Sequence, residues 1–351
     1  MPQQGSYTLQ QKTFAFSLVS NAAAAVTSNF ADAVTEKFNA LISQYPQYVG
    51  SNWSITWGPV VYSSSGSTSA DNTLMVISSS DANNGNPVYI VATAGTNSQS
   101  LYDIKIEDLD VGVVVPFGSG GASISQGTKF GLAILEAMVS NEQTIQQYLA
   151  SVVNTNATLI FTGHSLGGAL APTLALDLFA NQGLKTTQWA NVYVYPTAGP
   201  STGNAGFVTL FNNTFKAAPG WNTNVINSLD AVPKAWNHLD QIGGIFQPNL
   251  APSPCITAIV KLLQLKRGIH QFFYANIAQT PFTGKFNAQA VPPSPYETNA
   301  TCGFAAQELY QHIQAYVDHF VQEIAPLFPG VTLTADQCAA LVKRCTHMSA
   351  E

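Results

Sequence analysis

Apolar residues follow two different periods along the chain, and each period predicts a different kind of element. Segments 54–62, 74–78 and 88–92 are rich in β-branched and aromatic residues and are separated by Ser, Gly, Asn and Asp, which predicts three strands joined by turns. Residues 81–86 superficially resemble a calcium loop, but the glycine is misplaced and no Glu closes the loop, so we expect a hairpin there. Before these strands, apolar residues at helical spacing predict a helix over 22–41.

The rest of the chain alternates between helical and strand patterns. We expect helices at 129–139 and 142–153, a strand at 158–162, a helix after residue 166, strands at 191–195 and near 224–227, and a long C-terminal helical tract. Because parallel neighbouring strands need a crossover connection, this alternation predicts an α/β fold with a largely parallel central sheet and helices on both faces.

Residues 157–170 form the most informative stretch, in which an apolar strand runs through Gly163-His164-Ser165-Leu166-Gly167 into a helix. A serine at such a tight strand-to-helix turn projects its hydroxyl above the sheet. The crowded backbone there admits only small residues two positions away, here Gly163 and Gly167. The N-terminus of the helix adds free amide groups and a dipole that stabilise an oxyanion. The pattern predicts that Ser165 is a nucleophile.

A Gly-rich turn with a solvated serine is the alternative, and the strand before it and the helix after it disfavour that interpretation. Consecutive side chains leave a sharp turn in different directions. We therefore expect a structural role for His164 rather than the role of a base.

A serine hydroxyl is a poor nucleophile at neutral pH, so an imidazole must accept its proton and a carboxylate must orient that imidazole. In the expected fold the acid follows the serine and the histidine follows the acid. Asp230 fits because it follows a short apolar strand and precedes Pro233, whereas Asp177 lies inside the helix and Asp240 lacks a preceding strand. A turn-capping role is the alternative for Asp230. The later histidines are His238, His270, His312, His319 and His347, and periodicity does not decide among them.

Three blocks in this order resemble the class 3 lipases, the fungal-lipase-like branch of the α/β hydrolases. The blocks are residues 161–170, residues 192–200 with Gly203-Asn204, and residues 225–233. In that family the histidine opens the final helical segment as Gln-His with a Tyr four residues on, and Gln311-His312 with Tyr316 matches. The resemblance therefore implies that His312 is the base, with His270 and His319 in reserve.

The resemblance also implies where the second oxyanion donor lies. The family carries Arg-Gly-Ser/Thr after the strand that precedes its lid, and this chain has Ala94-Gly95-Thr96 there. Thr96 is then one donor through its backbone amide, and Leu166, beside the nucleophile, is the other. Ala94 stands where the family usually has Arg, a change that weakens contacts around the loop but removes no atom that touches the oxyanion.

Two further segments are expected to shape the site. In family members the region of residues 97–128 carries a lid, for which the glycine-rich end at 118–121 suits a hinge, and an ordinary surface loop is the alternative. Residues 234–298 are rich in apolar side chains that either form a cap over an acyl pocket or extend the core. With these insertions, we expect a single α/β-hydrolase catalytic domain over residues 1–351.

Composition narrows the class of partner. Only 9% of the 351 residues are charged, 46% are hydrophobic and the net charge is −6, and without a Lys/Arg cluster this argues against nucleic acid. No stretch reaches the ~20 apolar residues of a membrane span, and the first residues show no signal-peptide pattern.

The four cysteines, Cys255, Cys302, Cys338 and Cys345, allow two disulfides in any of three pairings. If 335–344 is helical, Cys338 and Cys345 lie too far apart to bridge unless the helix ends before Cys345. A low-charge chain with an even number of cysteines favours an extracellular setting, with the cytoplasm as the alternative.

Together these residues predict a serine ester hydrolase that needs no metal, organic cofactor or obligate protein partner, and the resemblance implies acylglycerols or related fatty-acid esters as its substrates. Phospholipase A1, feruloyl esterase and acyltransferase activities are alternatives because they share the acyl-enzyme. A hydrolase-like protein that binds lipid without catalysis is a further alternative of another class.

Overall fold

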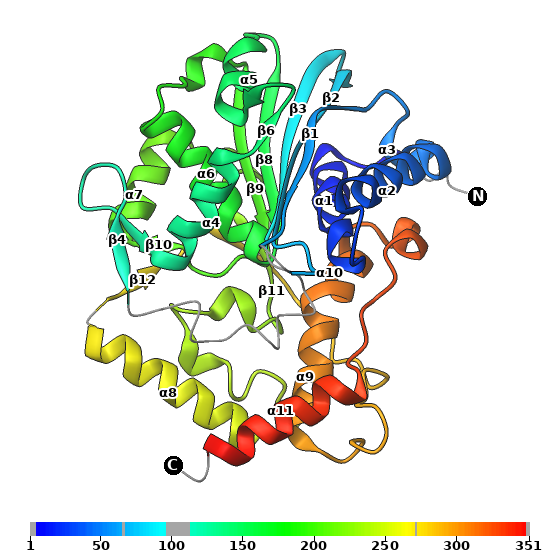
Figure 1. Ribbon diagram of the computed structural model, residues 1–351, viewed down its shortest axis with the longest axis vertical. Coiled ribbons are helices and arrows are strands. Elements are labelled where there is room, and N and C mark those ends of the chain that lie inside the picture. The colour runs from blue at the N-terminus through cyan, green and yellow to red at the C-terminus, as the bar shows by residue number, and fades with distance from the viewer. Residues whose placement is uncertain (1–4, 65–66, 96–112, 271, 349–351) are drawn as a thin grey trace.

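A twisted seven-stranded sheet forms the centre of the molecule in the computed structural model, which describes residues 5–64, 67–95, 113–270 and 272–348 (Figure 1). The strand order is β1-β2-β3-β8-β9-β11-β13, and only β1, β2 and β3 pair in antiparallel fashion. The largely parallel sheet is therefore as predicted. The bounds are β1 Ser54–Tyr62, β2 Asn72–Asn83, β3 Asn86–Ala94, β8 Thr158–His164, β9 Asn191–Thr197, β11 Asn224–Asn227 and β13 Gln279–Phe282.

The expected hairpin joins β2 to β3. Asn83 pairs with Asn86, and the two residues between them, Asn84 and Gly85, both have positive φ angles of 52° and 81°. Asn and Gly adopt this conformation at low cost, and two such residues in a row make the turn that best matches the twist of paired strands. The predicted hairpin is confirmed.

Helices cover both faces of the sheet, as predicted, and each face has its own apolar core. One core contains Phe161, Leu170 and Leu174 and lies under α4 Gln126–Ala137, α5 Ile145–Ser151, α6 Leu166–Ala180 and α7 Ala205–Thr214. The other contains Phe14, Ile160 and Tyr316 and lies under α1 Leu9–Ser20, α2 Phe30–Gln44, α3 Pro46–Val49 and α10 Ala315–Phe320. Both β8 and α6 are buried almost throughout, so they form the centre of the fold.

The single helix predicted over 22–41 is wrong at its start. A helix already spans Leu9–Ser20, a 3-10 turn follows at Asn21–Ala25, and the second helix begins only at Phe30. Asn29 has a φ of +52°, which breaks the helical path. The first helix has no one-sided apolar pattern because residues 13–20 are buried all round, so periodicity does not reveal it.

A further layer lies beneath the ends of the sheet strands that lead to the site (Figure 1). It contains α8 Pro254–His270, α9 Ala300–Leu309 and α11 Ala335–Met348, held by the disulfides Cys255–Cys345 and Cys302–Cys338. Cys338 and Cys345 share α11 and do not pair with each other, as their helical spacing predicts. An apolar cluster that includes Trp236, Phe246 and Phe304 fills the layer.

The two predicted insertions take different forms. The described part of 97–128 contains β4 Val114–Pro116 and β5 Ser123–Ser125, which join β10 Gly203–Asn204 and β12 Tyr274–Ala275 in a small sheet, before α4 begins at Gln126. A lid there stays a prediction, because residues 96–112 lie outside the described part. The segment 234–298 supplies α8, which is part of the layer beneath the sheet, and also β13, so it includes core as well as covering structure. A two-stranded ribbon, β6 Val139–Ser140 and β7 Gln143–Thr144, connects α4 to α5.

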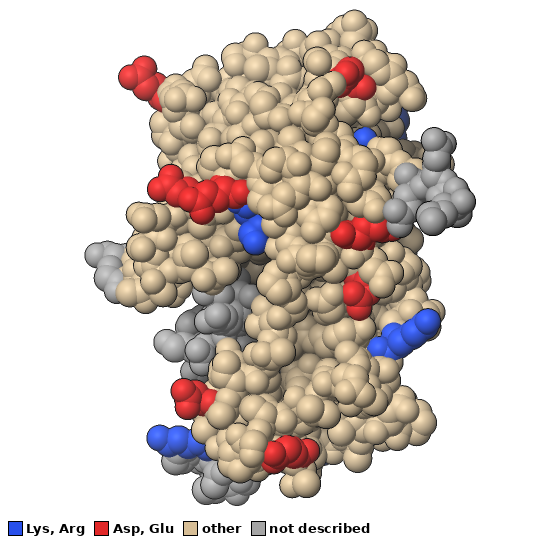
Figure 2. Space-filling view, turned by 90° about the vertical axis from the view of Figure 1, so that its right-hand side faces the viewer, with Lys and Arg blue, Asp and Glu red and all other residues tan. Residues whose placement is uncertain are grey.

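The surface is mostly uncharged. On the face in Figure 2, Lys, Arg, Asp and Glu side chains are few, and uncharged residues cover most of the surface between them. The outer side of α8 exposes Leu262, Leu265 and Ile269, with Phe273 close behind them in the chain. Among the described residues, no helix combines the length and apolarity that a membrane crossing needs.

Candidate active site

The candidate nucleophile occupies a strained turn between β8 and α6. Ser165 has φ 61° and ψ −127°, a conformation that few residues other than glycine adopt, and its amide donates a hydrogen bond to the Thr197 carbonyl at 3.0 Å. A methyl group at Gly163 would overlap the carbonyl of Gly167, and one at Gly167 would overlap the carbonyl of Thr93. The two glycines thus allow the strand, the turn and β3 to approach closely, as their spacing predicts.

The fold brings Ser165, His312 and Asp230 into one hydrogen-bonded row. His312 Nε2 lies 2.7 Å from Ser165 Oγ, and His312 Nδ1 lies 2.9 Å from Asp230 Oδ2. Asp230 follows β11, and His312 lies in a π-helical turn, Tyr310–Gln314, between α9 and α10. Asp230 and His312 are buried, while Ser165 is partly exposed. The row is the arrangement in which an imidazole removes a proton from a serine hydroxyl.

Asp230 is held as a carboxylate by several donors. Tyr316 Oη donates to Asp230 Oδ2 at 2.9 Å, and the Val232 amide donates to Oδ1 at 2.9 Å. Burial alone raises the pKa of Asp230, but the nearby imidazole of His312 and the hydrogen bonds with His312, Glu308 and the Val232 amide outweigh it, and the pKa of Asp230 lies below its usual value. The carboxylate therefore stays charged and able to orient His312.

Tyr316 connects this carboxylate to the sheet. Its side chain is fully buried, and its hydroxyl accepts a hydrogen bond from the Asn227 amide at 2.8 Å while donating to Asp230. Burial and the charge of Asp230 raise the pKa of Tyr316 well above its usual value, so the hydroxyl keeps its proton.

His164 hydrogen-bonds to the backbone of His312 without contacting the serine hydroxyl. Its Nε2 lies 2.7 Å from the His312 carbonyl and must donate to it, which leaves Nδ1 to accept from Thr197 Oγ1 at 2.9 Å. Burial, reinforced by the nearby His312, lowers the pKa of His164 to about 3, so the ring is neutral. Its position agrees with the expected structural role.

The other candidates lie apart from this row. His319 stacks on Phe282 with ring centroids 4.0 Å apart, and His238 bonds to its neighbour Asn237. Asp177 in α6 accepts from Asn181 and Gln182, and Asp240 is exposed. The side chains of His270 and His347 lie outside the described part of the chain.

Leu166 is the first residue of α6, so its amide belongs to the free N-terminal turn beside Ser165. Thr96, the other predicted oxyanion donor, lies outside the described residues. Gly95, which precedes it, packs so closely against Leu166 that a methyl group there would overlap the Leu166 side chain.

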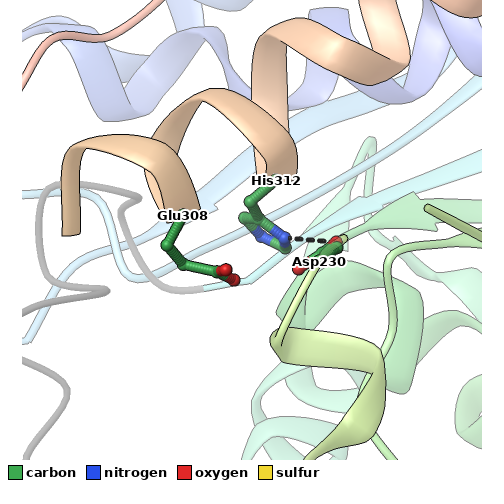
Figure 3. Close-up of side chains that lie close together, drawn as sticks. All are labelled: Asp230, Glu308 and His312. Carbon is green, nitrogen blue, oxygen red and sulfur yellow. Dashed lines mark hydrogen bonds and ion pairs between the residues drawn. The ribbon is translucent and has the colours of Figure 1, made fainter. Parts of the chain in front are cut away.

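Sequence reasoning missed two polar side chains beside this row. Glu308 accepts from the Ala231 amide at 2.9 and 3.2 Å, and its carboxyl lies next to Asp230 and His312 (Figure 3). Gln311 is buried; it accepts from Asn227 Nδ2 at 2.8 Å and donates to the Lys285 carbonyl at 2.7 Å. The i,i+4 spacing of Glu308 and His312 is the one signal that places both on one helical face.

Asp230, Glu308 and His312 also offer three ligand atoms within 4.8 Å of one another. The Nδ1 atom of His312 faces Asp230 at 2.9 Å, so a cation there would have to displace this hydrogen bond. The donor set fits the proton relay better than a metal site.

Comparisons with known proteins agree with this geometry. Residues 90–239 match the model of the class 3 lipase family. The structure resembles that of M37 lipase, with a TM-score of 0.76 and 26% identity over 97% of this chain and 100% of that chain. Its likeness to a lipase from Rhizopus microsporus var. chinensis is weaker, with a TM-score of 0.44 and 20% identity over 66% of this chain and 71% of that chain. Its likeness to lipase II from Rhizopus niveus has a TM-score of 0.45 and 19% identity over 64% of this chain and 74% of that chain. No curated protein sequence matches the chain.

The matched region contains the strained serine turn and Asp230, and the overall likeness to M37 lipase extends over nearly the whole chain. The central sheet and its two helical layers are those of the α/β-hydrolase fold. The match over residues 90–239 and the likeness to M37 lipase therefore support the class 3 lipase family, and the protein is a lipase-type hydrolase.

Proposed function

We propose that the protein hydrolyses carboxylic esters, acylglycerols or related fatty-acid esters, with Ser165 as nucleophile, His312 as base and Asp230 as the group that orients His312. The observation that carries the proposal is the continuous row of contacts, 2.7 Å from Ser165 Oγ to His312 Nε2 and 2.9 Å from His312 Nδ1 to Asp230. Because Asp230 is ionised, Nδ1 carries the proton that it accepts, and Nε2 is free to accept from Ser165.

The reaction then runs in two halves. Ser165 Oγ attacks the ester carbonyl carbon while its proton passes to His312 Nε2, and the resulting tetrahedral intermediate expels the alcohol, which takes that proton. Water next attacks the acyl-enzyme with His312 as base, and the acid product leaves with Ser165 restored. Asp230 stays ionised throughout and stabilises the imidazolium that forms in each half.

The oxyanion of each intermediate is assigned to the backbone amides of Leu166 and Thr96. The free N-terminal turn of α6 beside Ser165 supports the first assignment. The close packing of Gly95 on Leu166 supports the second, because it brings the end of β3 to the serine turn.

A lipid substrate agrees with the match of residues 90–239 to the class 3 lipase family and with the apolar side chains that α8 exposes, Leu262, Leu265 and Ile269. The two disulfides support an extracellular setting, because disulfides persist in oxidising compartments.

The test compares the purified protein with Ser165→Ala and with Ser43→Ala, a control at an exposed serine of α2. We expect Ser165→Ala to lose hydrolysis of p-nitrophenyl esters and triolein and labelling by a fluorophosphonate probe, with its circular dichroism unchanged. Ser43→Ala keeps both activities. Probe labelling that persists in Ser165→Ala would overturn the assignment of the nucleophile. Phosphatidylcholine and feruloyl esters in the same panel separate lipase from phospholipase and feruloyl esterase activity.

A further inference from the structure

Glu308 is an acidic side chain beside the row of Ser165, His312 and Asp230 that the reaction above does not use. It lies near the end of α9, one turn before His312, and Figure 3 shows that both side chains point toward Asp230. One oxygen of Glu308 accepts from the Ala231 amide at 2.9 Å, so the carboxyl is tied to the residue that follows Asp230. Ligand atoms of Glu308, Asp230 and His312 all lie within 4.8 Å of one another.

Two carboxyl groups this close do not both ionise at neutral pH without a cation between them, because like charges raise each other's proton affinity. In the described part of the chain, the titratable groups that face Glu308 are Asp230, His312 and Tyr316, and none of them is a permanent cation. One of the two carboxyls must therefore hold a proton.

The hydrogen bonds decide which carboxyl holds it. Asp230 faces three donors, namely His312 Nδ1, the Tyr316 hydroxyl and the Val232 amide, which all favour its charged form. Glu308 accepts from backbone amides and has Asp230 as its neighbouring anion. Burial and the charge of Asp230 accordingly raise the pKa of Glu308 well above its usual value.

We propose that Glu308 is a protonated carboxylic acid that donates a hydrogen bond to the Asp230 carboxylate, and that it is a positioning residue which fixes Asp230 toward His312. With this donor in place, Asp230 and Glu308 together carry one negative charge. The Asp230 oxygens then accept hydrogen bonds from Glu308, Tyr316 and Val232 as well as from His312. Glu308 acts only through Asp230 and does not touch the substrate. The proposal rests on the proposed function, but the state of its proton does not depend on activity.

The kinetic test uses Glu308→Gln and Glu308→Ala. Gln keeps an acceptor for the Ala231 amide and replaces the proposed O–H donor by N–H, so we expect kcat and the pH profile of kcat/KM to stay close to those of the parent. Ala removes both, and we expect kcat to fall about tenfold with KM unchanged, since a hydrogen bond to a charged group is lost. Glu136→Gln in α4 is the matched control, because that carboxyl also has a raised pKa but hydrogen-bonds to Gln182 away from the site.

The direction of the pH shift separates a neutral Glu308 from a charged one. If Glu308 were charged, both substitutions would remove a negative charge beside His312, and the acidic limb of kcat/KM would move to lower pH. Such a shift in Glu308→Gln overturns the proposal, and so does a Glu308→Ala variant with parental kcat and pH profile.

Infrared difference spectroscopy tests the proton directly, including the case in which Glu308→Ala does not fold. The starting protein carries Glu136→Gln, because the pKa of Glu136 is raised to about 8 and its neutral carboxyl would add a band of its own. At neutral pH we expect this protein to show the carbonyl stretch of a neutral carboxylic acid. The band should vanish in the double variant that also carries Glu308→Gln. Absence of any difference between the two spectra overturns the proposal. Because this readout needs no ester, its result stands whether or not the protein proves to be an esterase.

Discussion

The hydroxyl of Tyr316 makes two hydrogen bonds in a fully buried place, and Tyr316→Phe removes both while leaving the ring. The Asp230 carboxylate loses one charged hydrogen bond of 2.9 Å, which costs about 1.5–3 kcal/mol, and the buried Asn227 amide loses its acceptor at 2.8 Å, which costs about 1–3 kcal/mol. The free energy of unfolding should therefore fall by at least about 2.5 kcal/mol.

Activity should change in a matching direction. Removing a donor from Asp230 raises the pKa of that carboxylate, so protonation disrupts the Asp230–His312 pair at a higher pH. The acidic limb of kcat/KM should therefore move to higher pH by about one unit, which corresponds to about 1.4 kcal/mol. Denaturant unfolding and the pH profile with a p-nitrophenyl ester measure the two effects. Tyr310→Phe, at a hydroxyl that bonds to Asp318 on the exposed side of the same segment, is the control.

A Tyr316→Phe protein with a free energy of unfolding within about 0.5 kcal/mol of the parent, and with an unchanged acidic limb, would refute this reasoning. That size is the effect of an ordinary surface substitution. It would mean that Asp230 and the Asn227 amide find other partners once the hydroxyl is gone.

Three further outcomes follow from contacts described above. Gly163→Ala should destabilise the fold by about 2–3 kcal/mol in thermal or denaturant unfolding, because the new methyl group overlaps the Gly167 carbonyl; a fully stable variant would contradict the crowded turn. The pKa of Glu136 is raised to about 8, mainly by burial, so its contribution to the free energy of unfolding is complete below about pH 4.5 and is lost as the pH rises toward 8. Glu136→Gln should reduce this loss by about 1–2 kcal/mol, a figure that allows for screening by solvent at this partly exposed group. The free energy of unfolding measured against pH tests this, and an unchanged slope in Glu136→Gln would count against it. Replacing the Cys302–Cys338 disulfide, which spans 36 residues, by two alanines should cost about 4 kcal/mol in denaturant unfolding, and a loss below about 1 kcal/mol would show that the reduced chain is already ordered there.

The sequence predicted the parts of this molecule whose local pattern and tertiary role agree. Strands β1 and β3, the strand and helix around Ser165 and the short strand before Asp230 lie within a few residues of their expected bounds, whereas β2 continues beyond its expected end to Asn83. In each case the apolar residues follow the spacing or the continuous run that is typical of the element, and the turns contain Gly, Asn, Asp or Ser.

The parts that escaped prediction depend on packing between distant segments. The helix at Leu9–Ser20 is buried on all sides over residues 13–20, so its sequence does not alternate between an apolar and a polar face. Glu308 and Gln311 hydrogen-bond to Ala231 and Asn227, which lie about eighty residues earlier in the chain. The local sequence of either segment does not predict these contacts. His312 itself was chosen through the family resemblance, because periodicity left five histidines open.

The last strand of the central sheet, β13, comes from the segment between Asp230 and His312, and this limits how the protein can be re-engineered. Strand β13 pairs with β11 along Gln279–Phe282, and the carbonyl of Phe282 accepts from the Ser228 amide, two residues before Asp230. A chimera that exchanges all residues between Asp230 and His312 for those of another lipase would remove β13, the strand that hydrogen-bonds to β11 and to the turn before Asp230. An exchange within this segment would therefore have to leave β13 in place.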